Sequence, residues 1–157
     1  MRSEGVKLWC EDCGQTYEMN EYGQLNCTTG EPKFTHAPDW YKWERENVRQ
    51  QLLNGTYHYE ETLQVYSTPG VDKYIDIGTA KVTHNFNDGF IIEGHYNGND
   101  YKICRPTKGL YGLHVEYQFK HLKYEDCFSI STTNDAFYCM TKKKDIITKL
   151  ALATEEA

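Results

Sequence analysis

The stretch Leu113-His114-Val115-Glu116-Tyr117-Gln118-Phe119-Lys120 decides the fold class of the larger, C-terminal part of the chain. Every odd position in it is apolar and every even position is polar. Successive side chains of a β-strand point to opposite faces, so this alternation places one face in a core and the other in water. We therefore predict a strand over residues 113–120 in an antiparallel sheet with one solvated face.

The same two-residue period recurs on both sides of that stretch. Turn-forming sequences separate the segments, and Asn97-Gly98 is the strongest, because a two-residue hairpin turn requires positive φ at both positions. The predicted strands are residues 58–66, 73–77, 79–86, 89–96, 100–104, 113–120, 125–131 and 136–141. Since we expect seven strands, either one of these boundaries is wrong or one strand is bent at Gly78. Residues 56–157 are thus predicted to contain an antiparallel β barrel or sandwich.

A helix is predicted to close the chain over residues 145–156. Its apolar face consists of Ile146, Ile147, Leu150 and Ala153. Such a face would plug the open mouth of a barrel. Seven strands followed by a C-terminal helix resemble the pleckstrin-homology and GRAM-like superfold, and residues 78–94 are similar to the first hairpin of such domains. This resemblance implies a fold alone, because the superfold serves lipid-binding, peptide-binding and structural roles.

A second helix is predicted over residues 38–55, as a link between the N-terminal segment and the β domain. Asp39 is a suitable N-cap and Gly55 a suitable C′ residue. The apolar positions of the helix are Trp40, Tyr41, Trp43, Val48 and Leu52. Closely spaced aromatic residues of this kind anchor a helix to its own domain.

Residues 1–37 have the pattern of a degenerate zinc ribbon, in which not all of the metal ligands are present. Cys10-Glu11-Asp12-Cys13-Gly14 is a knuckle in which two thiolates grip one metal ion, while the glycine lets backbone N–H groups turn toward the sulfurs. Residues 16–27 then predict a hairpin that turns at Gly23 and brings Cys27 back to the knuckle. The candidate metal ligands are therefore Cys10, Cys13 and Cys27, and we expect their sulfurs to converge.

The fourth ligand of this candidate zinc site is missing from its usual place. A complete ribbon ends in a second Cys-x-x-Cys pair, but the chain has Gly30 where the last cysteine would stand. His36 is the nearest substitute. The sequence leaves two alternatives open. One is a zinc site completed by His36 or water, and the other is a ribbon that binds no metal and is stabilised by packing on the adjacent part of the chain. A catalytic zinc is disfavoured, since the motif supplies no general base.

The charge and hydropathy of the chain exclude several function classes. The formal net charge is -6, whereas nucleic-acid binders show a basic excess or a basic face, so we expect no nucleic-acid partner. No stretch has the ~20 apolar residues of a transmembrane helix, and the N-terminus lacks the apolar core of a signal peptide. A cytoplasmic location follows, in which the six cysteines are metal ligands or buried thiols rather than disulfides.

Weaker candidates are scattered over the β domain. His114 and Glu116 share a strand face, and we interpret them as exposed polar residues; the same interpretation applies to His84 and His95, which flank a hairpin and could pair across it. Three strand cysteines are interpreted as buried free thiols: Cys104, Cys127 and Cys139. A phosphate headgroup would be sought first at the basic loop formed by Lys102, Arg105 and Lys108.

Several segments together resemble the C-terminal extension of bacterial lysophospholipid acyltransferases of the 1-acyl-sn-glycerol-3-phosphate acyltransferase type. They are Leu25-x-Cys27, Pro38-Asp39-Trp40-Tyr41-x-Trp43-Glu44-Arg45, residues 78–94, residues 113–117 and residues 148–156. The resemblance spans nearly the whole chain, and its most specific part is the segment that begins at Pro38. The family's catalytic His-x4-Asp motif is absent: the run from His84 to Asp88 is one residue too short, and that from His36 to Asp39 two.

The resemblance implies a non-catalytic accessory domain of a phospholipid-synthesis enzyme. We expect the chain to be the C-terminal piece of a longer protein, whose catalytic domain uses acyl-CoA or acyl carrier protein at a membrane face. The accessory domain would dock that catalytic domain, an acyl carrier or a phospholipid headgroup at the membrane surface. The alternative is a free-standing zinc-ribbon module that binds another protein. An acyltransferase core encoded upstream of Met1 would decide for the first hypothesis.

Overall fold

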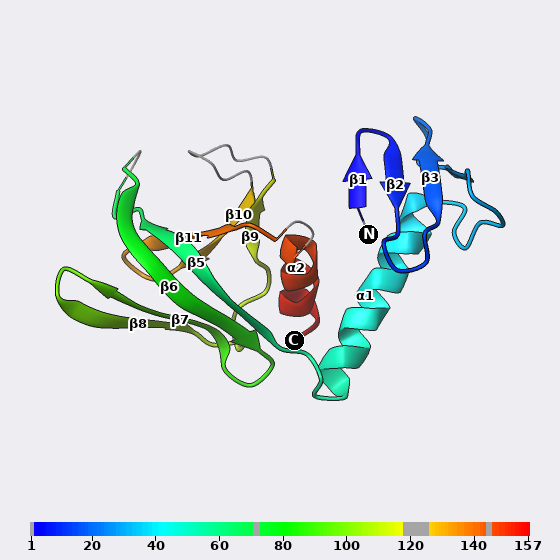
Figure 1. Cartoon of the computed structure of the whole chain (residues 1–157). Helices are drawn as coiled ribbons and strands as arrows, with labels where there is room; N and C mark the ends of the chain where they lie inside the picture. Colours follow the sequence, from blue (N-terminus) through cyan, green and yellow to red (C-terminus); the bar gives the residue numbers. More distant parts are fainter. Residues whose placement is uncertain (1, 71–72, 118–125, 144–145) are drawn as a thin grey trace. The chain divides into compact units, whose positions relative to one another are not determined.

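The computed structural model describes residues 2–70, 73–117, 126–143 and 146–157, which form two compact units (Figure 1). The first unit is Met1–Asn47 and the second is Val48–Ala157. The boundary between them lies inside helix α1 (Ala37–Leu53). The N-terminal part of α1 therefore belongs to the first unit, and its last residues belong to the second.

The first unit contains an antiparallel four-stranded sheet in the order β1-β2-β3-β4. Its strands are β1 (Arg2–Glu4), β2 (Lys7–Trp9), β3 (Thr16–Met19) and β4 (Leu25–Cys27). The predicted hairpin is confirmed: β3 pairs with β4, and Gly23 in the connecting turn has a φ of 76°. The core of this unit is aromatic, since the Trp40 ring lies 5.0 Å from Tyr17 and 5.2 Å from Phe34.

Helix α1 begins at Ala37, one residue before the predicted range of 38–55. The predicted N-cap Asp39 lies in its first turn, and the carbonyl of His36 accepts hydrogen bonds from the backbone N–H groups of Asp39 and Trp40. Pro38 is tolerated in the first turn, where a backbone N–H is not required. The C-terminal signal is confirmed: Gly55 has a φ of 66°, and its N–H group donates to Leu52 while Thr56 donates to Gln51. These two hydrogen bonds satisfy the last helix carbonyls in a Schellman motif.

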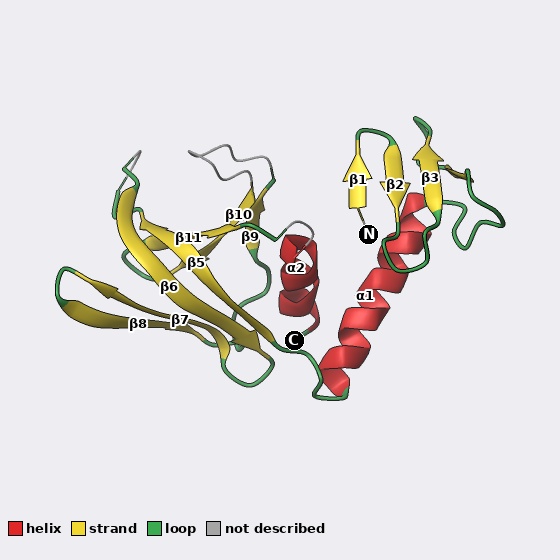
Figure 2. Ribbon diagram, in the orientation of Figure 1, coloured by secondary structure: helices red, strands yellow, loops and turns green. Residues whose placement is uncertain are grey.

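The second unit contains an antiparallel seven-stranded sheet in the order β8-β7-β6-β5-β11-β10-β9 (Figure 2). Its strands are β5 (Tyr59–Ser67), β6 (Ile75–Asn85), β7 (Gly89–Tyr96), β8 (Asn99–Arg105), β9 (His114–Glu116), β10 (Asp126–Ser131) and β11 (Ala136–Thr141). The prediction of a mainly β chain with antiparallel sheets and a C-terminal helix is thus confirmed. The turn at Asn97-Gly98 has positive φ at both residues, as expected.

Two predicted strand boundaries differ from the structure. Residues 73–77 and 79–86 are not separate strands, because β6 continues through Gly78, which has a φ of 85°. The pairing register of β5 with β6 shifts between Gln64 and Tyr66, opposite Gly78. The eight predicted segments therefore become seven strands, with one strand irregular at Gly78. Within the predicted strand 113–120, β9 is confirmed over His114–Glu116, and residues 118–120 lie outside the described part of the chain.

Helix α2 (Ile146–Glu156) packs against the sheet near β9 and β10. Three of its four predicted apolar residues, Ile147, Leu150 and Ala153, are fully buried in the main core, and Ile146 packs at the edge of that core. The helix therefore covers the core at one end of the curved sheet, as the plug interpretation predicts. Among the described residues, no helix is long and apolar enough to cross a membrane.

Candidate functional site

The cysteine knuckle forms a tight turn between β2 and β3. The N–H group of Gly14 donates to the carbonyl of Cys10 (2.9 Å), and the N–H group of Cys10 donates to Gln15 (2.9 Å). The pKa of the Cys10 thiol is lowered, first by the backbone N–H of Cys13 and also by the Cys13 thiol and the backbone of Asp12. Donors directed at the sulfur favour the thiolate, which is the form that binds a metal ion or reacts as a nucleophile.

The other two predicted ligands lie in different surroundings. Cys27 is opposite Tyr17 in the β3–β4 pair and packs against the aromatic core, with its sulfur 4.0 Å from Thr29 Oγ1. His36 is exposed at the start of α1, where its Nδ1 lies 3.1 Å from Thr35 Oγ1. The structure thus brings Cys10 and Cys13 together without gathering a third ligand beside them.

This arrangement leaves a complete zinc site without support. Among the described residues, no group of three or more His, Cys, Asp or Glu side chains could hold a metal ion. A structural zinc requires four ligands and a catalytic zinc three, whereas the knuckle supplies two. Zinc at Cys10, Cys13, Cys27 and His36 therefore stays a prediction.

A small cavity of about 80 Å³ lies beside the knuckle. Its lining includes both knuckle cysteines and the aromatic rings of Phe34, Trp40 and Trp43. Lys33 of the same unit covers this aromatic surface, because its Nζ lies 4.1 Å from the centroid of the Trp43 ring. The cation that such a group of rings would attract is therefore already supplied by the chain itself.

The histidine candidates of the second unit fall into two environments. His114 on β9 is exposed, as interpreted from the sequence, whereas Glu116 is half-buried; His114 Nε2 lies 3.1 Å from the Glu116 carboxylate. His95 is also exposed and lies 2.8 Å from Asp100. His84 corrects the sequence interpretation: it is 1% exposed and does not pair with His95.

The burial of His84 has electrostatic consequences. Its ring stacks on Phe90 with a centroid distance of 4.0 Å, and its Nδ1 lies 2.8 Å from the Tyr57 hydroxyl. Burial lowers the pKa of His84 to about 4, so the imidazole is neutral at neutral pH. A neutral, stacked and hydrogen-bonded imidazole is a structural residue of the core rather than an exposed acid or base.

Two of the three strand cysteines are buried thiols, as predicted. Cys127 and Cys139 are each 0% exposed, and burial raises the pKa of Cys127 to about 12 and that of Cys139 still further. Cys104 is an exception, because it is exposed on β8. A high pKa and burial make Cys127 and Cys139 poor nucleophiles.

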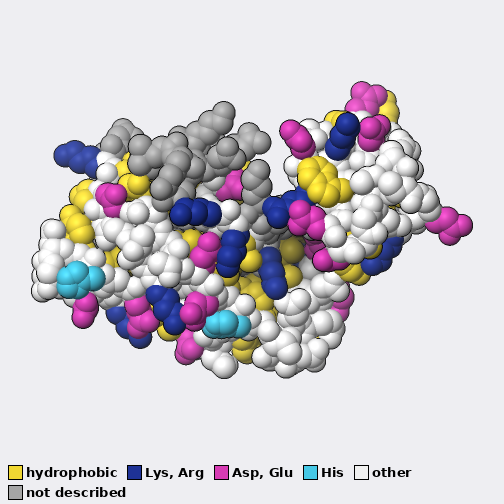
Figure 3. Space-filling view, in the orientation of Figure 1, with side chains coloured by type: hydrophobic (Ala, Val, Ile, Leu, Met, Phe, Trp, Pro, Cys, Tyr) yellow, Lys and Arg dark blue, Asp and Glu magenta, His cyan; other side chains and the backbone are white. Residues whose placement is uncertain are grey.

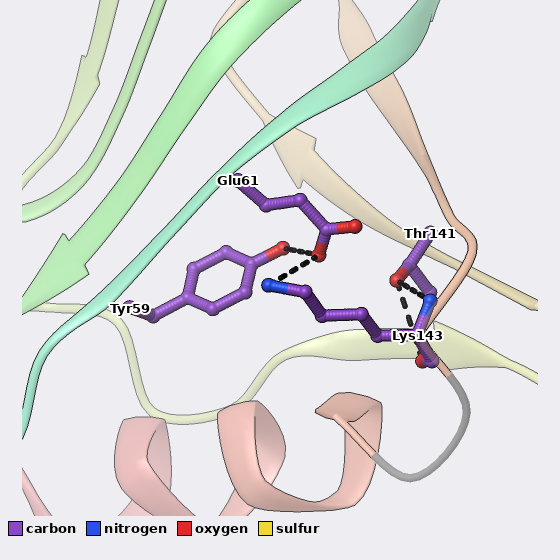
Figure 4. A network of polar contacts seen from close by, with 4 residues as sticks. All are labelled: Tyr59, Glu61, Thr141 and Lys143. Atoms are coloured by element: carbon purple, nitrogen blue, oxygen red, sulfur yellow. Dashed lines mark hydrogen bonds and ion pairs between the residues drawn. The ribbon is translucent and has the colours of Figure 1, made fainter.

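A polar network ties β5 to the segment that precedes α2 (Figure 4). The Tyr59 hydroxyl donates to Glu61 Oε2 (3.0 Å), and Lys143 Nζ lies 3.8 Å from the same oxygen. Thr141 Oγ1 accepts a hydrogen bond from the Lys143 backbone N–H (3.0 Å). Burial, and then the neighbouring Glu61 carboxylate, raise the pKa of Tyr59. This network links Lys143 to β5 and holds Tyr59 as a neutral donor.

The basic loop that was considered for a headgroup is not a convergent anion site. Lys102 Nζ lies 2.7 Å from the Glu93 carboxylate, which raises the pKa of Lys102. Arg105 is three residues further along β8, so its side chain leaves the opposite face of the strand. On the surface of the second unit seen in Figure 3, acidic side chains lie beside the basic ones. An anion would have to compete with these carboxylates.

The second unit also contains a larger cavity that the sequence did not reveal. Its volume is about 360 Å³, and its lining residues are Ser67, Ile75, Ile77, Tyr96, Asn99, Tyr101, Ile103 and Phe137. They come from the ends of β5, β6, β7, β8 and β11 next to the β7–β8 hairpin turn. Their apolar alternation is visible in the sequence, but the strand order that brings them together is not.

Tyr101 is the most distinctive residue of this lining. Its ring lies over Gly94, the opposite residue on β7, where an added Cβ would come within 2.5 Å of the ring and hydroxyl atoms. Within the part of the chain that the structure describes, its hydroxyl is buried and has no hydrogen-bond partner. Desolvation raises the pKa of Tyr101, so this hydroxyl is a neutral donor.

Among the described residues, a small cavity thus lies beside the cysteine knuckle and a larger apolar one at an end of the seven-stranded sheet. The thiols of Cys10 and Cys13 are the reactive groups at the small cavity. Mainly apolar side chains line the larger one. Comparison with known proteins adds no relative, because no family model, no curated protein and no solved structure matches the chain.

Proposed function

We propose that the chain is a non-catalytic C-terminal accessory domain of a bacterial phospholipid-synthesis acyltransferase of the 1-acylglycerol-3-phosphate type. It docks the catalytic domain of the same polypeptide and an acyl donor carrier or a phospholipid of the membrane surface. The apolar cavity of the second unit receives the acyl chain. The domain acts in the cytoplasm and reaches the membrane through the parent protein. Seven strands and a C-terminal helix agree with the pleckstrin-homology-like fold that the sequence suggests.

The observation that carries this proposal is the chemistry of the apolar cavity. Its volume of about 360 Å³ lies at the lower end of the range of about 300–1,000 Å³ found for small-molecule sites. Its walls are isoleucine and aromatic side chains, with Ser67 and Asn99 as the small polar groups. Burial of an alkyl chain on such walls is favourable by about 0.8 kcal/mol per CH₂ group. A hydrocarbon chain is therefore the ligand that this lining suits best.

The distribution of charge favours the acyl chain over the headgroup as the recognised part of a lipid. The net charge is -6, and Lys102, which is near the predicted headgroup loop of Arg105 and Lys108, is paired with Glu93. A phosphate headgroup would need cations free to pair with it. The proposal therefore places the ligand's polar end outside the cavity's apolar walls or against a neutral donor.

Binding is tested directly by methyl-labelled isoleucine in an NMR titration with methyl octanoate. We expect the resonances of Ile75, Ile77 and Ile103 to shift, while those of Ile130 and Ile147, which lie in the main core, stay in place. The cavity-filling variant Ile103→Trp should abolish the shifts. The matched control Cys104→Trp, at an exposed neighbouring position on β8, should retain them. Shifts spread evenly over all isoleucines, or none up to the solubility limit, would refute the binding site.

The non-catalytic part of the proposal has its own test. The purified chain should not transfer an acyl group from acyl-CoA to lysophosphatidate, since it lacks the His-x4-Asp motif. Transfer well above the buffer rate that a single substitution within the chain abolishes would contradict the assignment. Identification of an acyltransferase domain upstream of Met1 in the encoding gene would support the parent enzyme directly.

The contacts at Cys10 favour a second candidate function, a zinc-ribbon module that binds another protein. Backbone N–H groups directed at the sulfur stabilise a metal-bound thiolate as well as a free one. Metal analysis of protein purified without chelators should then find zinc that is lost in a Cys10→Ser/Cys13→Ser double variant. Absence of zinc from wild-type protein supplied with an excess of the metal would remove this candidate.

A further inference from the structure

The buried hydroxyl of Tyr101 adds chemical information that the volume of the apolar cavity does not contain. Among the described residues it has no acceptor, and it belongs to a ring that lines the cavity. A buried polar group without a partner is costly, and native proteins leave few of them. The hydroxyl packs over Gly94 and is closed off from solvent, so a ligand must turn the Tyr101 ring to reach it. A ligand that brings an acceptor atom to the turned ring would remove the cost, whereas a pure hydrocarbon would not.

The acceptor of such a ligand is restricted by the charges of the lining. None of the described residues that line the cavity carries a formal charge. An ionised carboxylate that enters an apolar cavity must be paired with a cation, or it pays a large desolvation cost. A neutral ester, thioester or amide carbonyl needs one hydrogen-bond donor, and the neutral Tyr101 hydroxyl is such a donor.

We propose that the cavity selects neutral acyl derivatives over free fatty acids, and that Tyr101 sets this selectivity by donating its hydroxyl hydrogen to the ligand's carbonyl oxygen. This inference rests on the proposed acyl-binding function and specifies its ligand class. Gly94 contributes by leaving room for the Tyr101 ring. Tyr101 is a specificity-determining residue in this scheme, and no chemical step is assigned to it.

The experiment is a titration of wild-type protein and Tyr101→Phe with three probes at neutral pH: methyl octanoate, octanoate and n-hexane. Wild-type protein should bind methyl octanoate at least about tenfold more tightly than ionised octanoate. Tyr101→Phe should weaken methyl octanoate binding by about three- to tenfold, the worth of one neutral hydrogen bond, and leave n-hexane binding unchanged. The matched control is Tyr111→Phe, which alters a tyrosine that is 92% exposed and outside the cavity lining, and it should change none of the affinities.

The outcomes separate this inference from the function on which it rests. Equal affinity for octanoate and methyl octanoate, or an unchanged ester affinity in Tyr101→Phe, would overturn the assigned selectivity while acyl binding itself stands. Failure of all three probes to bind would overturn both. A Gly94→Ala variant offers an independent check, because its methyl group must displace the Tyr101 ring and should lower the ester affinity without removing the hydroxyl.

Discussion

Among the described residues, the core of the first unit has four buried hydrophobic side chains, including Trp40, whereas the main core of the second has eighteen between its sheet and its helices. The small core consists mainly of aromatic contacts between the β3–β4 hairpin and the start of α1. The large core is continuous from the end of α1 through the inner face of the sheet to α2. A small core has little redundancy, since each side chain is a large share of the apolar surface that it buries. The two units should therefore respond very differently to the same kind of damage.

The largest expected effect is that of Trp40→Ala. Truncation of a buried tryptophan costs about 3–5 kcal/mol, which we expect to exceed what the small core can lose. Amide hydrogen exchange should show loss of protection in β2, β3 and β4, with the second unit still protected. Trp43→Ala is the matched control, because Trp43 is 42% exposed and its removal should leave that protection in place. Simultaneous loss of protection in both units would contradict their independence.

Acid should weaken the second unit and spare the first. The pKa of His84 is about 4 in the folded chain, below the 6.5 of an unperturbed histidine, so the unfolded state binds more protons between these values. The free energy of unfolding of the second unit should fall as pH drops through that window, by about 3 kcal/mol in all. The first unit contains one histidine, His36, which is exposed.

The pH effect is measured by urea denaturation at a series of pH values. His84→Phe keeps a ring beside Phe90 and removes the titrating group, so its unfolding free energy should depend less on pH than that of wild-type protein. His95→Gln changes an exposed histidine and should leave the wild-type pH dependence intact. Identical slopes for wild type and His84→Phe would show that another group is responsible.

A pair of glycines compares the packing of the two units at equal backbone strain. Gly23 in the first unit and Gly89 in the second have φ values of 76° and 72°. Alanine at either position costs about 1 kcal/mol for the left-handed conformation. An added Cβ at Gly89 would also lie 2.2 Å from the Arg105 carbonyl oxygen, whereas nothing lies within 4 Å at Gly23. Denaturant unfolding should therefore show at least about twice the loss for Gly89→Ala, and equal losses would mean that the close approach relaxes freely.

The smallest expected effect has the opposite sign. Tyr101→Phe removes a buried hydroxyl that has no partner among the described residues, so it should stabilise the second unit by up to about 1 kcal/mol. Tyr57→Phe makes the same chemical change where the hydroxyl lies 2.8 Å from His84 Nδ1, and it should destabilise by a similar amount. Chemical denaturation of both variants measures the contrast. A destabilised Tyr101→Phe would mean that the hydroxyl has a partner, such as water.

Most of the fold could be predicted, because the two-residue period and the turn sequences act locally. Alternation located the strands, and Gly23, Gly55 and Asn97-Gly98 marked turns whose positive φ values the structure has. The pattern was less informative where packing is not local. Phe86 continues the apolar period of β6 and yet is 49% exposed, because it lies beyond the end of the strand. Likewise, Cys104 resembles the other strand cysteines and faces outward.

The candidate sites were harder to predict than the strands. A knuckle is a local motif, so Cys10 and Cys13 lie together as expected. Cys27 depends on how β4 is placed against the core, and no sequence signal revealed that it packs beside Tyr17. The apolar cavity draws on five strands, and its lining follows from the strand order. His84 showed its burial only by occupying the apolar phase of β6, between Val82 and Phe86.

Because Cys127 and Cys139 are buried, chemical labelling of their thiols reports local opening of the seven-stranded sheet. Alkylating reagents attack the thiolate, and these two sulfurs are both out of contact with solvent and held in the thiol form. Exposed Cys13 and Cys104 should be labelled without any unfolding, whereas Cys127 and Cys139 should react only after their part of the sheet separates. Mass spectrometry of pulse-labelled protein would then measure how often the β domain opens, from the extent of labelling at cysteines that are already present.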